Sequence, residues 1–242
     1  MDAEIDGQRV SAQVEVLVWS DIVRESMSSS IPATYWQLLR TAWVYIGSGA
    51  LWRLMRLRKG PVIAALYPVG MLIAQALLAV ALSLLTYGLL GMLSDHWAAR
   101  LAFAALGMGL GIALLRWFKK KDGKFFAYYL MHDYAYSAAT KGANPPQLEA
   151  RMATFGDAIA AALTDDVDEV LVIGHSSGAH LGVSVLADLI RSGRVAEGGP
   201  ALGLLTLGQV VPMVSFLPRA ERLRGDLRYL SARDELAWVD VT

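Results

Sequence analysis

The chain has 242 residues, enough for one sizeable domain or for a domain with an insertion. Its formal net charge at pH 7 is zero, which argues against nucleic-acid binding, and the absence of cysteine excludes disulfides and thiolate metal sites. Hydrophobic residues make up 55% of the chain and the mean hydropathy is +0.41, which is too high for a plain soluble domain and indicates a membrane. The polar, acidic start of the chain is not a signal peptide.

Residues 9–18 alternate apolar and polar side chains, with Val14, Val16 and Val18 at every second position. This alternation predicts a β-strand with one buried face. Asp21 follows soon after, either as a turn or cap residue or as a functional carboxylate. We therefore expect residues 1–33 to supply the N-terminal strand and loop of an α/β domain.

A helical pattern over residues 34–60 combines aromatic and basic side chains without any acidic one. Aromatic rings and long basic side chains suit a membrane interface, where one part of the side chain is apolar and the other is wet. We expect an interfacial amphipathic helix; the alternative is a core helix with a solvated basic edge. Arg40 and Arg53 argue against a membrane span here.

The segment 61–118 predicts a transmembrane hairpin. Residues 61–93 carry no charge, and a helix of that length would measure about 50 Å against a hydrocarbon core of roughly 30 Å. We therefore expect Pro68 to kink the helix or mark its start, with the span near 69–92. After a polar turn, residues 101–115 form a second apolar stretch. Small residues in this stretch should allow it to approach the first helix closely. They are Gly107, Gly109 and Gly111.

Basic residues flank the predicted hairpin on both sides, whereas its turn has only Arg100, offset by Asp95. The positive-inside bias places both flanks in the cytoplasm and makes the lipid bilayer a partner of the chain. The flanking residues are Arg53, Arg56, Arg58 and Lys59 before the hairpin and Arg116, Lys119, Lys120, Lys121 and Lys124 after it.

Residues 119–242 return to soluble patterning. Helical segments at 147–163, 179–190 and 220–230 alternate with apolar strands at 170–173, 202–207 and 237–241, which predicts a parallel α/β sheet. An earlier aromatic helix, 125–140, contains His132 and Asp133. Adjacent residues point to different helix faces, so we expect a structural role for this pair rather than proton transfer.

The strand at 170–173 runs into Gly174-His175-Ser176-Ser177-Gly178 and then into a helix. A strand, G-x-S-x-G and a helix make a nucleophile elbow, in which the serine sits on a strained turn with its hydroxyl exposed. We expect Gly174 and Gly178 to keep side chains out of the close strand–helix approach, and the Ser177 N–H to face a developing oxyanion. The alternative is an ordinary βα turn with a serine N-cap.

These residues resemble the α/β-hydrolase superfamily, specifically lipase- and esterase-like members with Gly-His-Ser-x-Gly. The chain also resembles bacterial membrane-embedded proteins in which a two-helix hairpin interrupts that fold. The resemblance implies that Ser176 is the nucleophile, that the Ser177 N–H is one oxyanion donor and that His175 is not the base. It also implies a multi-pass location in the bacterial inner membrane, where the charge bias places the hydrolase-like portion on the cytoplasmic side. The order Ser, acid, His makes Asp240 the best candidate acid, with a purely structural role as the alternative.

The resemblance fails at the histidine. His180 is the only one after Ser176, and it lies four residues along the same helix, where it cannot reach the serine. We therefore expect the chain to be a piece of a longer protein, the alternatives being a truncated gene or a degenerate hydrolase. No metal or cofactor is implied.

Three functions are compatible with this pattern. The first is a membrane-anchored serine hydrolase that forms an acyl-enzyme at Ser176, with a hydrophobic or lipid-derived ester as substrate and a base from outside the chain. The second is a non-catalytic binding or scaffolding module. The third is a transporter component, which two spans without internal charge argue against.

Overall fold

The structure, a computed structural model, describes residues 2–5, 8–25, 30–57, 59, 62–63 and 66–241. Arg58 in the basic flank and residue 61 at the start of the apolar segment lie outside these residues. The helices and strands, in chain order, are β1 (Asp2–Ile5), β2 (Gln8–Ser11), α1 (Ser20–Glu25), α2 (Ile31–Gly47), α3 (Ala50–Leu57), α5 (Tyr67–Gly91), α6 (Trp97–Lys120), α7 (Asp122–Phe125), α8 (Ala127–Ala139), α9 (Pro146–Ala162), β3 (Glu169–His175), α10 (Gly178–Arg191), β4 (Ala201–Leu207), α11 (Val211–Ser215), α12 (Glu221–Leu230) and β5 (Leu236–Val241).

The parallel sheet predicted for the second half of the chain is confirmed. Its three strands lie in the order β3-β4-β5, and both pairings are parallel. The register places Gly174 of β3 and Asp240 of β5 on opposite sides of Thr206 in β4. The carboxyl ends of all three strands therefore meet at one edge, where the chain turns from β3 into α10.

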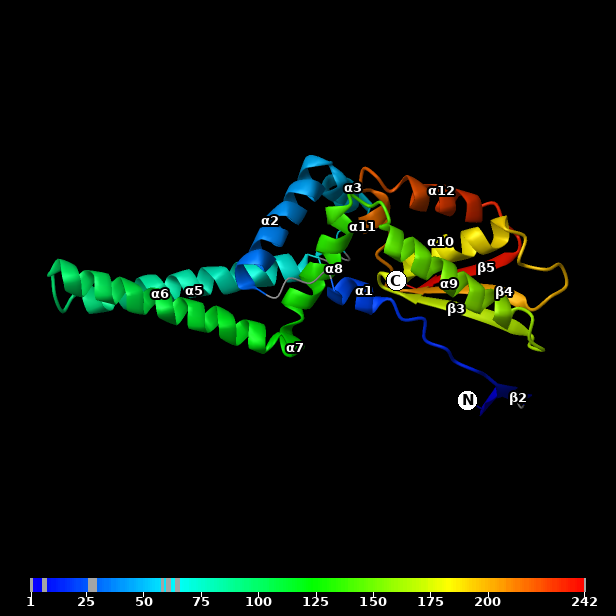
Figure 1. Cartoon of the computed structure of the whole chain (residues 1–242), viewed down its shortest axis with the longest axis horizontal. Helices are drawn as coiled ribbons and strands as arrows, with labels where there is room; N and C mark the ends of the chain where they lie inside the picture. The colour runs from blue at the N-terminus through cyan, green and yellow to red at the C-terminus, as the bar shows by residue number, and fades with distance from the viewer. Residues whose placement is uncertain are drawn as a thin grey trace.

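Helices α9, α10 and α12 lie on the same side of this sheet (Figure 1). They share one core with the side chains of the facing strands. The helix predicted over residues 147–163 is present as α9, and its Met152 and Ile159 are buried in that core. Apolar residues on one helical stripe account for this packing, because burial of such a stripe is the main source of helix stability in a folded chain.

The opposite face of the sheet is bare. Leu171, Ile173, Val239 and Val241 point to this face and are 47%, 58%, 57% and 53% exposed. Among the described residues no helix covers these side chains, whereas parallel sheets are ordinarily covered on both faces. The architecture is thus a mixed α/β fold with a small, one-sided parallel sheet.

The strand predicted over residues 9–18 is wrong. Instead, β2 ends at Ser11 and pairs with β1 in a short antiparallel hairpin, and residues 12–19 have no regular secondary structure. Val14 and Val16 are 69% and 77% exposed. The β-propensity of alternating valines reflects packing against neighbouring strands, and here the segment has no partner in the sheet.

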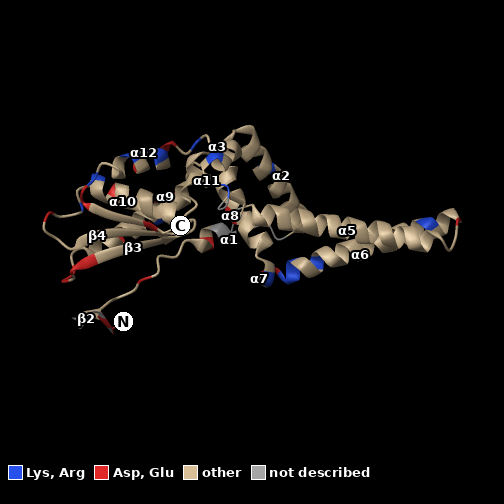
Figure 2. Cartoon of the chain, turned by 180° about the vertical axis from the view of Figure 1, so that it is seen from behind, with Lys and Arg blue, Asp and Glu red and all other residues tan. Residues whose placement is uncertain are grey.

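Helices α5 and α6 are long and apolar enough to cross a membrane, and they project together from the rest of the molecule (Figure 1). Their most apolar windows are only 17% and 11% buried, unlike those of core helices. The sequence predicts either a kink or a helix start at Pro68. Pro68 lies in the first turn of α5, so it marks the start of the helix. Figure 2 shows basic residues, coloured blue, at the two ends of the pair and few charged residues between them.

Two of the three glycines predicted to allow close helix approach do so. A Cβ on Gly107 would lie 2.5 Å from the Ser83 carbonyl oxygen of α5, and one on Gly111 would collide with the Ser83 side chain and lie 2.9 Å from the Ala79 carbonyl oxygen. Gly109 meets no atom within 4 Å, so the prediction is wrong for that residue. The difference follows from helical periodicity: residues four apart share a face, and the residue between them points away.

The base of the hairpin packs against α2 and α8 rather than against the sheet. Leu38 of α2, Leu72 of α5 and Met131 of α8 form one buried cluster. The Tyr45 hydroxyl donates to the Met213 carbonyl oxygen at 3.0 Å and so joins α2 to α11. The single helix expected over 34–60 is two helices, because the chain turns at Gly49 with φ of 72°.

Candidate functional site

The turn between β3 and α10, where the sequence predicts a nucleophile elbow, has a serine in a strained backbone conformation. Ser176 adopts φ of 52°, a left-handed conformation that costs a non-glycine residue roughly 1–3 kcal/mol. The Ser176 N–H donates to the Leu207 carbonyl oxygen of β4 at 3.0 Å, which fixes the strained residue at the edge of the sheet. Strain of this kind persists only where the surroundings hold it in place, and it gathers at functional sites.

Gly174 is required by the close approach of strand and helix. A Cβ at this position would lie 2.7 Å from the Cα and 3.0 Å from the backbone nitrogen of Ala179, and 3.0 Å from the Gly178 carbonyl oxygen. All three are backbone atoms that cannot rotate aside. Gly178 is different, because a Cβ there would meet nothing within 4 Å. The expectation that both glycines clear this space holds for Gly174 and is wrong for Gly178.

Ser177 precedes the first residue of α10, but its side chain makes no capping hydrogen bond. Its hydroxyl instead donates to Oδ2 of Asp133 at 2.6 Å. Within the described part of the chain no acceptor takes the Ser177 N–H, which stands among the unpaired donors of a helix N-terminus. The turn is therefore not a βα turn capped by a serine side chain, and the Ser177 N–H is available to an anionic atom.

Asp133, which the sequence pattern assigned to a structural role apart from the elbow, reaches the site from α8. Burial raises the pKa of this carboxyl, and the hydrogen bond from Ser177 partly opposes that shift. The bond joins residues 44 positions apart, so no local pattern could show it. The one sequence feature that could have pointed to Asp133 is that it is a carboxylate within a helix otherwise rich in aromatic and apolar residues.

Two histidines, His175 and His180, lie close to Ser176 in the chain, and the structure places them in different surroundings. His175 is exposed at the end of β3, and His180 is buried one turn into α10. Burial lowers the pKa of His180 to about 4, and its Nδ1 has no hydrogen-bond partner among the described residues. A cavity of about 10 Å³, the room of a single water, lies against this ring. In the part of the chain that the structure describes, no histidine forms a hydrogen bond to Ser176.

Asp240 lies at the carboxyl end of β5, as the sequence indicated. Its Oδ1 accepts a hydrogen bond from the Thr206 hydroxyl at 2.6 Å, and the Trp238 indole nitrogen donates to the same hydroxyl at 3.2 Å. Thr206 is fully buried, whereas Asp240 is exposed. The sheet thus places Asp240 two strands from the elbow strand, in a network that ties β5 to β4 and includes neither Ser176 nor Asp133.

The site has no arrangement for a metal ion: over the described ranges, no three His, Cys, Asp or Glu side chains gather closely enough to hold one. The residues that the structure does bring together are Gly174, Ser176, Ser177 and Asp133, at the base of α10.

The chain matches no model of a known protein family, no curated protein and no solved structure.

Proposed function

We propose that this chain is the membrane-anchored part of a serine hydrolase that attacks ester or acyl substrates through Ser176. The observation that carries the proposal is the φ of 52° at Ser176, on a strand-to-helix turn whose approach only a glycine at position 174 permits. A strained serine presented in this way resembles the nucleophile of the α/β-hydrolase superfamily, to which we assign the chain.

In the proposed reaction the Ser176 hydroxyl attacks the substrate carbonyl, and the Ser177 N–H hydrogen-bonds to the oxyanion of the tetrahedral intermediate. Asp133 holds the Ser177 side chain at 2.6 Å and so restrains the residue whose N–H acts. The proton of Ser176 requires a base, because an unassisted hydroxyl is too weak a nucleophile at neutral pH. We assign that base to a histidine from outside these residues, and Asp240 to the role of the acid that would orient it.

The membrane has a direct part in this proposal. We propose that α5 and α6 cross the bacterial inner membrane and that the basic residues at their base hold the sheet in the cytoplasm. Helix α2 adds an exposed stripe opposite its buried face, formed by Trp36, Leu39, Trp43 and Ile46. Trp43 is 80% exposed, which suits the headgroup region of a bilayer.

The same geometry favours a hydrophobic substrate. Asp133 lies on α8, the helix whose buried face packs against α5 and α2 at the base of the hairpin. The elbow is therefore connected to the membrane-proximal cluster by one helix and one hydrogen bond. We therefore propose a lipid-derived ester as the substrate class.

A second candidate function is a binding or scaffolding module that retains the elbow without catalysis. It is favoured by one observation: among the described residues no histidine hydrogen-bonds to Ser176. The two functions differ in whether Ser176 forms a covalent acyl intermediate.

The test is pre-steady-state hydrolysis of p-nitrophenyl esters by the full-length protein in nanodiscs. A hydrolase should release a burst of nitrophenol stoichiometric with the protein, because acylation precedes the slower deacylation. Ser176→Ala should abolish the burst. Ser192→Ala, a matched variant at the far end of α10, should keep it, since Ser192 only hydrogen-bonds to the Asp188 and Leu189 carbonyl oxygens. Absence of a burst from the wild-type protein would favour the binding module.

A further inference from the structure

A basic hollow lies at the opposite end of α10 from Ser176. It has a volume of about 420 Å³, within the range of small-molecule sites. Three arginines and no carboxylate line the hollow. The lining residues are Arg191, Gly225, Arg228, Tyr229, Ala232 and Arg233. Helix α10 has 14 residues and is about 21 Å long, so the hollow is separate from the elbow.

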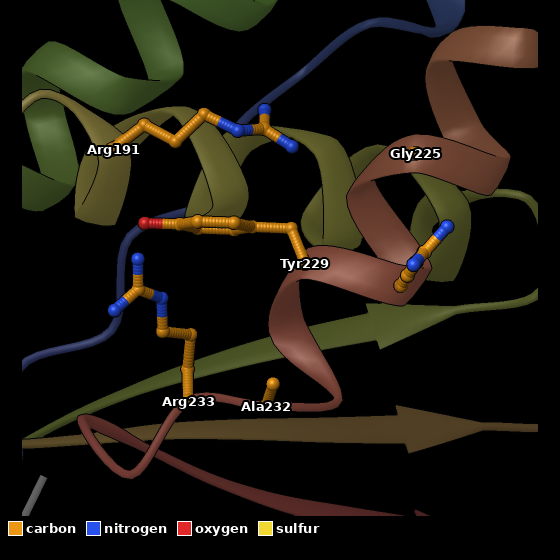
Figure 3. A pocket seen from close by; sticks show the side chains of 6 residues that line it. Arg191, Gly225, Tyr229, Ala232 and Arg233 are labelled. Atoms are coloured by element: carbon orange, nitrogen blue, oxygen red, sulfur yellow. The ribbon is translucent and has the colours of Figure 1, made fainter.

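Tyr229 stands between two guanidinium groups at the centre of the hollow. Arg191 lies over one face of its ring and Arg233 over the other, with their Cζ atoms 4.4 Å and 4.3 Å from the ring centroid (Figure 3). Both contacts are cation–π interactions, and together they hold two positive charges in fixed places. Because both ring faces are occupied, the tyrosine cannot stack on a nucleobase. The ligand that fits is an anion that contacts the guanidinium edges.

The three arginines differ in how far their charges are already compensated. Arg191 bonds to the buried carboxylate of Asp226 at 2.7 Å and approaches Asp188 at 3.3 Å, so it also holds α10 to α12. Arg233 is 3.8 Å from Glu235, a long and exposed pair of little strength. Among the ion pairs of the described residues, none includes Arg228. The charges available to a ligand are therefore those of Arg228 and Arg233.

We propose that this hollow binds a small anion that carries two phosphoryl groups. Guanidinium groups match phosphate oxygens in bidentate hydrogen bonds. Arg228 and Arg233 both line the hollow, and each guanidinium can bind one phosphoryl group, which suits two linked charged groups better than one compact ion. Gly225 leaves one wall open, because a Cβ there would meet nothing within 4 Å. This site does not depend on the function proposed for Ser176.

The test is isothermal titration of the full-length protein in nanodiscs with pyrophosphate, at low salt and in 0.2 M NaCl. We expect saturable binding by one pyrophosphate that weakens in salt, since screening acts on exposed charges. The variant Arg228→Gln/Arg233→Gln should raise the Kd at least about tenfold, because each charge-assisted hydrogen bond contributes at that level. Arg191 is left unchanged, because its removal would leave the buried Asp226 carboxylate with only the 3.9 Å contact to Arg222.

The control is Arg194→Gln, which removes the same charge from an exposed arginine that pairs with Asp157 at 2.8 Å outside the hollow. Its Kd for pyrophosphate should equal that of the wild type. The proposal is overturned if millimolar pyrophosphate does not bind, or if Arg194→Gln weakens binding as much as the double variant. Equal affinity for sulfate and pyrophosphate would also overturn it, because a single compact anion would then suffice.

Discussion

Replacement of Gly174 by alanine tests the elbow packing most sharply. The new Cβ would lie 2.7 Å from the Ala179 Cα, and real Cβ atoms essentially never approach so closely. Because β3 is paired along its whole length with β4, the strand cannot move away without loss of sheet hydrogen bonds. Overpacking of this kind costs about 1–3 kcal/mol. For a chain of this size we expect the Tm to fall by roughly 2–12 °C.

Gly178→Ala is the matched control. It adds the same methyl group four residues away, at the first residue of α10, where nothing lies within 4 Å. Alanine is favoured over glycine in a helix by about 1 kcal/mol, so the Tm should stay constant or rise slightly. Both variants can be followed by the intrinsic fluorescence of the detergent-solubilised protein during thermal unfolding. If Gly174→Ala unfolds at the same temperature as Gly178→Ala, the close strand–helix approach described here does not exist.

Further predictions concern the hairpin, the half-buried Asp133 carboxyl and the buried His180. Gly107→Ala should lower the Tm of the full chain, because its Cβ would press on the α5 backbone, whereas Gly109→Ala should not; equal effects would contradict the described helix face. Ser177→Ala should cost about 1–3 kcal/mol in unfolding free energy, because it leaves the half-buried Asp133 carboxyl without its hydroxyl donor; an unchanged Tm would refute that contact. The pKa of His180 is lowered from 6.5 to about 4, so the unfolded chain binds the proton first and stability should fall as the pH drops from 6.5 towards 4, by roughly 1.4 kcal/mol per unit. His180→Gln should reduce this slope in Tm measured against pH, and an unaltered slope would show that the ring is not buried.

The features that could be predicted from the sequence are those set by local patterns. The turn from β3 into α10, the three parallel strands and the apolar helix pair each follow from residues close together in the chain, such as Gly174 and Ser176 at that turn. Asp133 could not be placed in this way, because its bond to Ser177 depends on how α8 packs at the base of the hairpin. The valines of residues 12–18 led to a wrong strand prediction for a related reason. The β-propensity of a residue depends on packing against neighbouring strands, and the sequence of one segment does not show whether such neighbours exist.

The sequence also could not show which individual glycines are required by close packing. Gly174, Gly178, Gly107 and Gly109 occur in similar small-residue patterns, yet only Gly174 and Gly107 face backbone within 3 Å. Which member of a glycine pattern matters is decided by the rotation of one helix against its neighbour.

The central claim is that Ser176 is a nucleophile, and covalent labelling tests it most directly. Membranes that contain the full-length protein would be treated with a fluorophosphonate, and the modified residue would be identified by peptide mass mapping. The proposed hydrolase predicts stoichiometric modification at Ser176 that is lost in Ser176→Ala and kept in Ser192→Ala. Protein that is folded in the membrane but carries no label at Ser176 would contradict the proposal and establish the elbow as part of a binding module.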